Sequence, residues 1–480
     1  MAIFTKSHIR CIAVLVFVII GGGVFVSLGV NRQQKKPDSR QNSTVCQDCN
    51  VLLVAFDALQ AAHVSSFGYD KKTTQTIDAF AQEGISFHNT ITAAPWTVPS
   101  FMSIFTDAYP SHHKVVNKFS VYTKDEKVVA NLSKLSPNMQ TLAEIFKQNG
   151  YATAGFTGDA GVGSQFGYNQ GFDTYTDEVS FGSMENSAGH ALDWLKTHQS
   201  QKFFVFLHGY DAHGQFKLPP DFKGIFMSPD YKGSFKGTPE EQANLREEGL
   251  LKGEINLSPA DVKFWRNWYD SKIYNADNRF ATFWQEFQKL GIKNKTIVVI
   301  FSDHGTEFYE HKRLDHGFSL YDELVRVPLV FVVPGLEGKK VIEEQVRTID
   351  IAPTILDIVG IKPNTQYQSQ LEGETLMPYL LGQGGSSRDA FIETDYRDYT
   401  HKRGIRTKDG WKFVLTLENN HQELYNLKDD PGETKNLIEE NPRLAFDLEL
   451  RVREHLKEMG EDPYKTWGVG CLPVYQDQCQ

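Results

Sequence analysis

The sequence predicts an α/β fold in which a parallel sheet is covered by helices on both faces. Apolar runs without a polar interruption occur at residues 51–56, 203–207 and 297–301, as expected for strands that are buried on both sides. Stretches with helical periodicity separate these runs, and a fourth run at 327–333 ends at Pro334. A polar residue follows directly after the first two runs and within two positions of the third.

The composition is that of a globular protein. The chain has 480 residues, of which 40% are apolar, 12% aromatic and 23% charged. Fifty Lys and Arg oppose sixty Asp and Glu, which gives a net charge of −10. Such a chain has no excess of positive charge with which to hold a nucleic acid backbone, so we expect no nucleic acid partner.

The first element in chain order is a predicted membrane anchor within residues 1–30. Residues 11–30 carry no charge, and as a helix they would span the roughly 30 Å of a bilayer's hydrocarbon core. The alternative is a cleaved signal peptide. Positive residues flank both sides of the segment, so its orientation stays open. Residues 31–49 form a polar tether.

The cysteines are placed at the two ends of the chain. Cys46 and Cys49 precede the body, Cys471 and Cys479 close the chain, and Cys11 lies in the apolar segment. We expect disulfides, and therefore an oxidising compartment such as a periplasm, a cell surface or a lumen. The sequence does not determine which cysteines pair with each other. A four-cysteine zinc site is the alternative.

The body divides into a catalytic domain at 50–387 and a C-terminal subdomain at 388–480. In the second part, residues 404–416 predict a hairpin that turns at Asp409 and Gly410. The segment Leu-Tyr-Asn-Leu follows at 424–427, and a helix is predicted at about 443–459. We expect a small α+β subdomain.

Acidic and imidazole side chains follow the predicted strands. Asp57 ends the first run, His208 and His213 follow the second, and Asp303 and His304 follow the third. Ligands of open α/β sheets bind at the carboxyl ends of the strands, so these side chains converge at one edge. Asp and His together suit a divalent ion such as Ca, Mg, Mn or Zn. Taken singly, each residue also fits a helix cap or an ordinary histidine.

A candidate nucleophile precedes a predicted helix. Pro99 suits a first helical turn and places Thr97 at the helix N-terminus, where backbone N–H groups favour an anion. A threonine hydroxyl becomes a competent nucleophile in that field and beside a divalent metal. The alternative is that Thr97 only caps the helix.

The body resembles the sulfatases of the alkaline phosphatase superfamily from Asn50 to about Leu456. The blocks that carry the resemblance, in family order, are residues 50–59, 68–69, 94–100, 109–110, 150–153, 171–173, 302–305, 320–329, 350–356, 371–376 and 423–437. The resemblance implies a three-layer α/β/α sandwich with a small C-terminal antiparallel sheet.

The resemblance also implies residue roles. Asp57, Asp303 and His304 would hold the metal together with Thr97, which stands at the nucleophile position. His213 and His316 would occupy positions of substrate-binding and leaving-group residues. His208, as a neighbour of this set, is a further catalytic candidate, and with Asp211 and His213 it could complete a second metal site.

The chain departs from the sulfatases at several of these positions. Sulfatases carry Cys or Ser where Thr97 stands, oxidise it to formylglycine, and carry Arg where Phe101 stands. Lys and His are missing after residues 150–153. The remaining replacements of family residues lie at Ala58, Gln60 and Ala62. With Thr at the nucleophile position, the chain resembles the phosphodiesterases and phospholipid head-group transferases of the superfamily.

Three functions follow in order of preference. The first is a membrane-anchored, extracytoplasmic, metal-dependent hydrolase or transferase of phosphate mono- or diesters, with Thr97 as nucleophile. The second is a sulfatase acting on sulfate esters, and the third is a non-catalytic binding protein that retains the fold. The expected partner is an anionic ester, for which lipids, glycans and small molecules all remain open.

Overall fold

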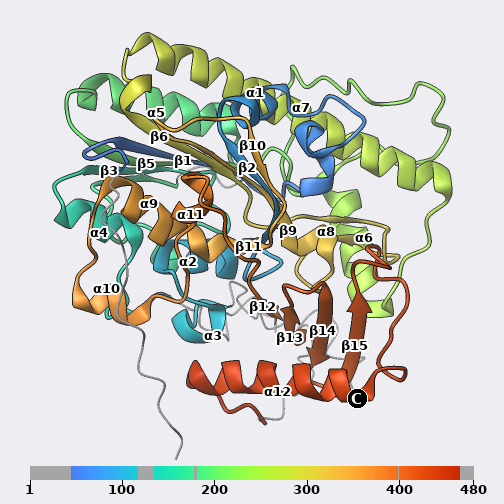
Figure 1. Cartoon of the computed structure of the whole chain (residues 1–480). Coiled ribbons are helices and arrows are strands. Elements are labelled where there is room, and N and C mark those ends of the chain that lie inside the picture. The colour runs from blue at the N-terminus through green and yellow to red at the C-terminus, as the bar shows by residue number, and fades with distance from the viewer. Residues whose placement is uncertain (1–44, 117–133, 178–180, 398, 465–480) are drawn as a thin grey trace, which may run out of the picture. The chain divides into compact units, whose positions relative to one another are not determined.

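A computed structural model describes residues 45–116, 134–177, 181–397 and 399–464, all within one compact unit at 42–480. The described residues form a nine-stranded sheet (Figure 1). Its strands are β1 (Asn50–Phe56), β2 (Ile85–Ile91), β3 (Ala152–Phe156), β4 (Thr174–Thr176), β5 (Phe203–Gly209), β6 (Thr296–Phe301), β9 (Arg326–Val332), β10 (Lys340–Ile342) and β11 (Val346–Arg347).

The strand order is β10-β2-β9-β6-β1-β5-β3-β4, and β11 pairs with β2. The three predicted central strands are confirmed, and β1 lies between β5 and β6 with parallel pairing on both sides. The fourth run, β9, pairs antiparallel with both β6 and β2, so the sheet is mixed and the prediction of a parallel sheet is wrong for this strand. An apolar run buried on both faces carries no signal for strand direction, which is why its direction was not predictable.

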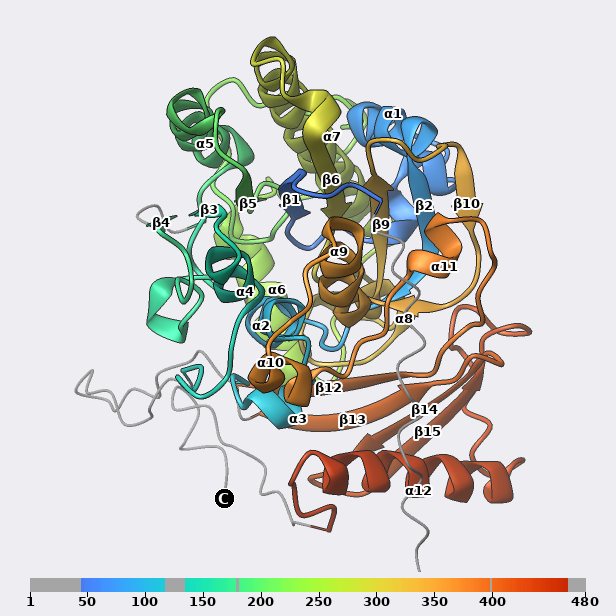
Figure 2. The same cartoon turned by 60° about the vertical axis from the view of Figure 1, so that its left-hand side comes forward.

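Helices cover both faces of this sheet, as the sequence predicts (Figures 1 and 2). One face carries α1 (Gln75–Glu83), α5 (Met184–His198) and α7 (Pro259–Lys289). The other carries α2 (Thr97–Thr106), α4 (Leu142–Gln148), α9 (Ile351–Val359) and α11 (Met377–Leu380). The result is a three-layer α/β/α arrangement.

Alternate residues of β1 point to the two faces and join two separate apolar cores. Leu53 packs in the core beneath α2 and α9, whereas Leu52 and Val54 pack in the core beneath α5 and α7. All seven residues of β1 are buried. A central strand held on both sides in this way fixes the position of the residue that follows it.

A four-stranded antiparallel sheet follows in the C-terminal part. Its strands are β12 (Ala390–Tyr396), β13 (Thr400–Arg406), β14 (Trp411–Thr416) and β15 (His421–Asn426), and α12 (Pro442–Glu458) packs on it. The predicted hairpin turn is present, and Gly410 adopts φ 88°, which favours glycine. The other α-helices and strands of the described residues are α3 (Pro110–His113), α6 (Pro239–Lys252), β7 (Glu307–Phe308), β8 (Leu314–Asp315), α8 (Asp322–Val325) and α10 (Thr365–Gln370).

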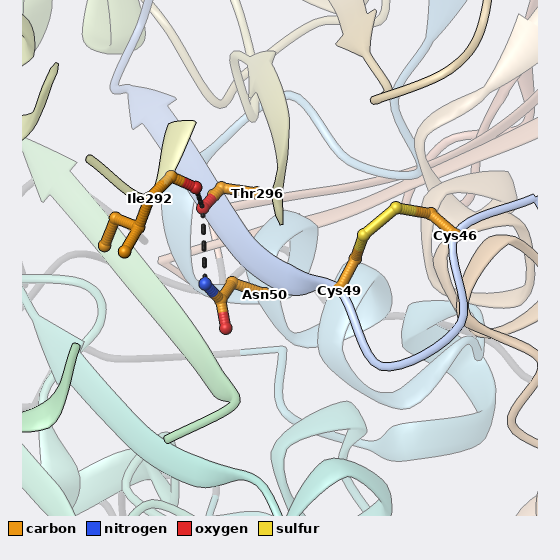
Figure 3. The surroundings of a disulfide bond; sticks show 5 residues. All are labelled: Cys46, Cys49, Asn50, Ile292 and Thr296. Atoms are coloured by element: carbon orange, nitrogen blue, oxygen red, sulfur yellow. Dashed lines mark hydrogen bonds between the residues drawn. A yellow bond between two sulfur atoms is a disulfide. The ribbon is translucent and has the colours of Figure 1, made fainter. Parts of the chain in front are cut away.

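Cys46 and Cys49 form a disulfide just before β1 (Figure 3). Next to it, the Asn50 side-chain amide donates a hydrogen bond to Thr296 Oγ1 over 3.4 Å, which connects the starts of β1 and β6. The predicted anchor at 11–30, and Cys11, Cys471 and Cys479, lie outside the described residues. Within the described part of the chain, no helix is both long and apolar enough to cross a membrane.

Candidate metal and nucleophile site

The carboxyl ends of three neighbouring strands bring the predicted site residues together. Ala55 of β1 pairs with His208 of β5 on one side and with Phe301 of β6 on the other. Asp57 and Asp303 therefore leave the sheet at the same edge, as parallel neighbours must. This part of the site was predictable from the sequence because it needs only strand positions and a parallel register.

Asp57, Asp303 and His304 form a tight group. His304 Nε2 lies 3.6 Å from Asp57 Oδ1 and 3.4 Å from Asp303 Oδ2. One ligand atom from each of the three residues falls within 4.8 Å of the others, and all three side chains are 0% exposed. Two carboxylates and an imidazole at this spacing are a suitable donor set for one divalent ion.

The electrostatics of the two carboxyl groups favour a cation between them. Burial, and then the charge of Asp57, raise the pKa of Asp303 well above its ordinary value of 3.8. The Ala58 N–H donates to Asp303 Oδ1 over 3.3 Å, and Oδ2 accepts no hydrogen bond from any described residue. A buried carboxylate oxygen without a donor is costly, and a divalent ion would stabilise it. The residues present therefore fit a metal.

The two histidines beside Asp57 are held in opposite tautomers. His304 Nδ1 donates to the Gly305 carbonyl over 2.6 Å, so its Nε2 offers a lone pair to the group. The Gly158 N–H donates to His208 Nδ1 over 3.3 Å, so His208 carries its proton on Nε2 and donates it to Asp57 Oδ2 over 3.1 Å. Burial lowers the pKa of His208 to about 3, which keeps it neutral. His208 thus orients Asp57, as a hydrogen-bond donor.

Thr97 is the first residue of α2, and its hydroxyl lies at the group. Its Oγ1 lies 3.3 Å from His304 Nε2, and the residue is 1% exposed. The three other hydroxyls of this helix face elsewhere. Ser100 donates to the Asp303 carbonyl, Ser103 pairs with His113, and Thr106 donates to the Met102 carbonyl. The predicted position at the helix N-terminus is confirmed.

His213 and His316 lie next to His304, and His213 Nε2 is 3.9 Å from Asp57 Oδ1. The ring centroids of His213 and His316 are 4.7 Å apart, and those of His304 and His316 are 4.3 Å apart. These three imidazoles form a second set whose nitrogens lie within 4.8 Å of one another. Asp211 does not join it, because its carboxylate accepts the Met184 N–H at the start of α5 over 2.5 Å. The predicted second set of His208, Asp211 and His213 is therefore not assembled.

Several charged residues near the site were not predicted. Asp315 contacts His316 Nδ1, and Arg246 of α6 lies 3.3 Å from the other oxygen of Asp315. Lys272 of α7 donates to the His213 carbonyl over 2.8 Å, and burial lowers its pKa to about 8. The helical periodicity gives no signal for these contacts, because α6 and α7 reach the site only through the tertiary packing.

Aromatic side chains close the site next to Thr97. Phe101, which stands where sulfatases carry Arg, is 0% exposed and packs edge-on against His208 with ring centroids 5.1 Å apart. Burial raises the pKa of Tyr210 well above 10, which keeps its phenol protonated. Tyr210 gave no sequence signal beyond its place one residue after β5.

The three-layer fold, with carboxylates, an imidazole and a hydroxyl at the carboxyl edge of its sheet, defines a hydrolase of the alkaline-phosphatase-like class. A family model described as Sulfatase matches residues 49–361, and one described as N-sulphoglucosamine sulphohydrolase, C-terminal, matches residues 309–462. The chain belongs to the sulfatase family, whose members hydrolyse sulfate or phosphate esters.

Individual relatives are similar along most of the chain. The Delta 4,5-hexuronate-2-O-sulfatase of Bacteroides thetaiotaomicron is 24% identical over 435 residues, which cover 82% of this chain and 85% of that protein. A solved 2-O GAG sulfatase superposes with a TM-score of 0.69 at 21% identity, covering 89% of this chain and 95% of the other. The phosphonate monoester hydrolase of Agrobacterium radiobacter superposes with a TM-score of 0.66 at 20% identity, covering 86% and 95%.

Proposed function

We propose that this protein is a metal-dependent hydrolase or transferase that cleaves phosphate mono- or diesters, with Thr97 as the nucleophile. The observation that carries the proposal is the position of the Thr97 hydroxyl, 3.3 Å from His304 Nε2 and at the N-terminus of α2. A threonine cannot be oxidised to an aldehyde, so the hydroxyl itself must react. A hydroxyl that attacks phosphorus in line requires no such modification.

The proposed metal ligands are Asp57, Asp303, His304 and Thr97. A divalent ion held there would favour the deprotonated hydroxyl and offset charge on the non-bridging ester oxygens. The ion could be Ca, Mg, Mn or Zn, because carboxylate and imidazole ligands suit each of them. His208 supports this set by holding Asp57 through its Nε2–H.

The reaction would proceed in two displacements. In the first, a bond forms between Thr97 Oγ1 and phosphorus, and the bond from phosphorus to the leaving oxygen breaks. Thr97 would release its proton to solvent, and His316 or His213 would give the leaving oxygen a proton. In the second, water or an acceptor hydroxyl attacks phosphorus, the bond to Thr97 breaks, and both protonation states are restored.

Sulfate ester hydrolysis is the second candidate, and the names of the relatives favour it. The hexuronate-2-O-sulfatase and the 2-O GAG sulfatase are named for sulfate esters, whereas phosphonate monoester hydrolases are phosphorus counterparts among the similar structures. The names of the relatives thus support hydrolysis of sulfate esters, whereas Thr97 and Phe101 support cleavage of phosphate esters. Because the relatives are named as enzymes, they support catalysis over the binding-protein alternative.

Paired substrates distinguish the two candidates. Purified protein with Zn, Mn, Mg or Ca added singly would be assayed with bis(4-nitrophenyl) phosphate, 4-nitrophenyl phosphate and 4-nitrophenyl sulfate. We expect turnover of at least one phosphate ester to exceed that of the sulfate, and Thr97→Ala to abolish it. Turnover of the sulfate alone would overturn the phosphate ester proposal and leave sulfatase activity as the function.

The proposed location is an oxidising compartment outside the cytoplasm. The disulfide between Cys46 and Cys49 supports it, because such bonds persist in oxidising compartments and are rare in the cytosol. The proposed membrane anchor at 11–30 would hold the enzyme at that surface. Fractionation of cells should find the protein in the membrane fraction, with its body accessible to protease from the extracytoplasmic side.

A further inference from the structure

A second cavity lies beside the turn that follows β1. Its volume is about 710 Å³, which is within the range of sites for small molecules. Its wall includes Gln60, Ala62 and His63, and the first two of these are positions where the chain departs from the sulfatases. Neither Thr97 nor any proposed metal ligand is among the lining residues. The cavity is therefore a separate candidate site.

Gly305 lies between this cavity and the metal site. Its carbonyl accepts the Nδ1–H of His304, a proposed metal ligand. A Cβ at Gly305 would lie 2.0 Å from the Glu323 carbonyl oxygen and 3.4 Å from Gln60 Cβ, and both of these residues line the cavity. The two sites are neighbours that share no lining residue.

His63 brings a hydrogen-bond acceptor to the cavity. Asp270 of α7 contacts His63 Nδ1 over 2.6 Å and accepts from the Tyr69 hydroxyl over 2.8 Å and from Lys71 Nζ over 2.5 Å. Burial acts to raise the pKa of Asp270, but the contacts with His63 and Lys71 lower it overall, so the carboxylate is ionised and can only accept. His63 therefore carries its proton on Nδ1.

Nε2 of the neutral His63 ring then offers a lone pair. From the described residues it receives no hydrogen bond, although the residue is only 5% exposed and lines the cavity. An acceptor placed so deeply favours a ligand that supplies an O–H or N–H group.

Arg326 brings a positive charge to the same cavity. The pairing of β2 with β9 shifts register between Phe87 and Thr90, and there Arg326 Nη1 donates to the His88 carbonyl over 3.2 Å. Among the residues that the structure describes, no carboxylate forms an ion pair with Arg326. Its remaining guanidinium N–H groups are available to an anion.

The acidic side chains of the cavity leave this charge unmatched. Three of the four have a basic partner within 3.2 Å: Asp322 has Arg406, Glu310 has Arg266, and Glu343 has His88. The fourth is Glu323, whose pKa is raised well above 4.5 by burial and then by the charge of Glu307, which keeps it uncharged. An anionic ligand would therefore find Arg326 as its counter-charge.

We propose that this cavity binds a small hydroxylated anion, either a sugar acid or a sugar phosphate. Arg326 holds the carboxylate or phosphate group, and His63 Nε2 accepts a hydrogen bond from a hydroxyl. The rings of Phe67 and His88, with centroids 4.1 Å apart, line the wall and face the apolar side of the sugar ring. The proposal does not depend on which ester the Thr97 site cleaves.

The test is isothermal calorimetry of the full chain with D-glucuronate, D-glucose 6-phosphate, D-glucose and acetate, in the Thr97→Ala background so that no ester is consumed. We expect at least one of the two hydroxylated anions to bind with a Kd of about 1 mM or lower. D-glucose and acetate should bind about tenfold more weakly or less, because each lacks one of the two recognised groups. The tighter of the two anions identifies the group that Arg326 holds.

Two variants remove the proposed contacts one at a time. Arg326→Gln should weaken binding by about tenfold or more, because it removes a charge-assisted hydrogen bond. His63→Phe should weaken it by about fivefold, the typical effect of one neutral hydrogen bond. Thermal unfolding of each variant checks that the fold is retained.

Ala62→Trp and Arg279→Gln complete the design. Ala62 is an exposed residue of the cavity wall, so an indole there fills the space without removing a hydrogen bond and should abolish binding. Arg279 of α7 pairs with Asp221 over 2.6 Å and does not line the cavity, so Arg279→Gln should leave the affinity within about twofold of the parent.

Three results would overturn the proposal. The first is that neither hydroxylated anion binds. The second is binding that survives both Arg326→Gln and Ala62→Trp, which would assign the ligand to the Thr97 site. The third is an equal loss in Arg279→Gln and Arg326→Gln, which would show a general effect of charge.

Discussion

The Thr97 hydroxyl oxygen lies 3.3 Å from Nε2 of His304, although 207 positions separate the two residues along the chain. Thr97 begins α2, and His304 follows β6 at the carboxyl edge of the sheet. A hydroxyl at a helix N-terminus is thus placed against the group of Asp57, Asp303 and His304.

Removing Asp303 should abolish metal binding and flatten the pH dependence of stability. Its pKa is raised in the folded protein, so in metal-depleted protein it contributes stability that is present below its ordinary pKa of 3.8 and lost as pH rises. The unfolding free energy, measured with denaturant in the presence of a chelator, should therefore fall less between pH 4 and pH 8 for Asp303→Asn than for wild type. Elemental analysis of Asp303→Asn should find no bound divalent ion.

Asp277→Asn is the control for that measurement. Burial raises the pKa of Asp277 to about 6, but its carboxylate accepts the backbone N–H groups of Thr76 and Ile77 at the start of α1. It should also weaken the pH dependence while leaving the metal content unchanged. Equal pH dependence in wild type and Asp303→Asn would contradict the raised pKa of Asp303.

Replacing Phe101 with Arg should destabilise the protein without creating a sulfatase. Phe101 is fully buried among the rings of His208, Phe206 and Phe301. An unpaired guanidinium there should cost about 3 kcal/mol or more of unfolding free energy. Phe101→Leu should cost about 1 kcal/mol. Urea unfolding measures both, and a Phe101→Arg variant as stable as wild type would show that an acidic partner is available at this position.

Replacing His316 should affect poor leaving groups most. If His316 protonates the leaving oxygen, His316→Gln should slow esters of weakly acidic alcohols by about 10²-fold or more and 4-nitrophenyl esters much less. Steady-state rates over a series of leaving groups provide the measurement. Equal losses across the series would assign the proton donor elsewhere, with His213 the next candidate at a ring distance of 4.7 Å.

Thiol counting tests the proposed compartment. Denatured, unreduced protein from its native membrane should show no free thiol at Cys46 or Cys49. The Cys46→Ser, Cys49→Ser double variant should lose about 2 kcal/mol of stability at most, because the disulfide closes a very short loop. Two reactive thiols at these positions in the freshly isolated protein would place the domain in a reducing compartment.

Asp57, Asp303 and His304 were predictable because a strand end fixes the residue that follows it. The direction of β9 was not, since an apolar run reads the same in either orientation. The contact between Tyr210 and Gly161 was not predictable either, because the two residues lie 49 positions apart and meet only in the folded chain. Such contacts come from tertiary packing and leave no local periodicity in the sequence.

The most direct test of Thr97 as the nucleophile is mass spectrometry of the protein quenched in acid during turnover of bis(4-nitrophenyl) phosphate. The account predicts a phosphoryl adduct on the peptide that contains Thr97, no adduct in Thr97→Ala, and a loss of about 10³-fold or more in turnover by that variant. Metal content in Thr97→Ala should remain measurable, because the two carboxylates and His304 are retained. Turnover by Thr97→Ala at the wild-type rate would contradict the account and indicate direct attack by water.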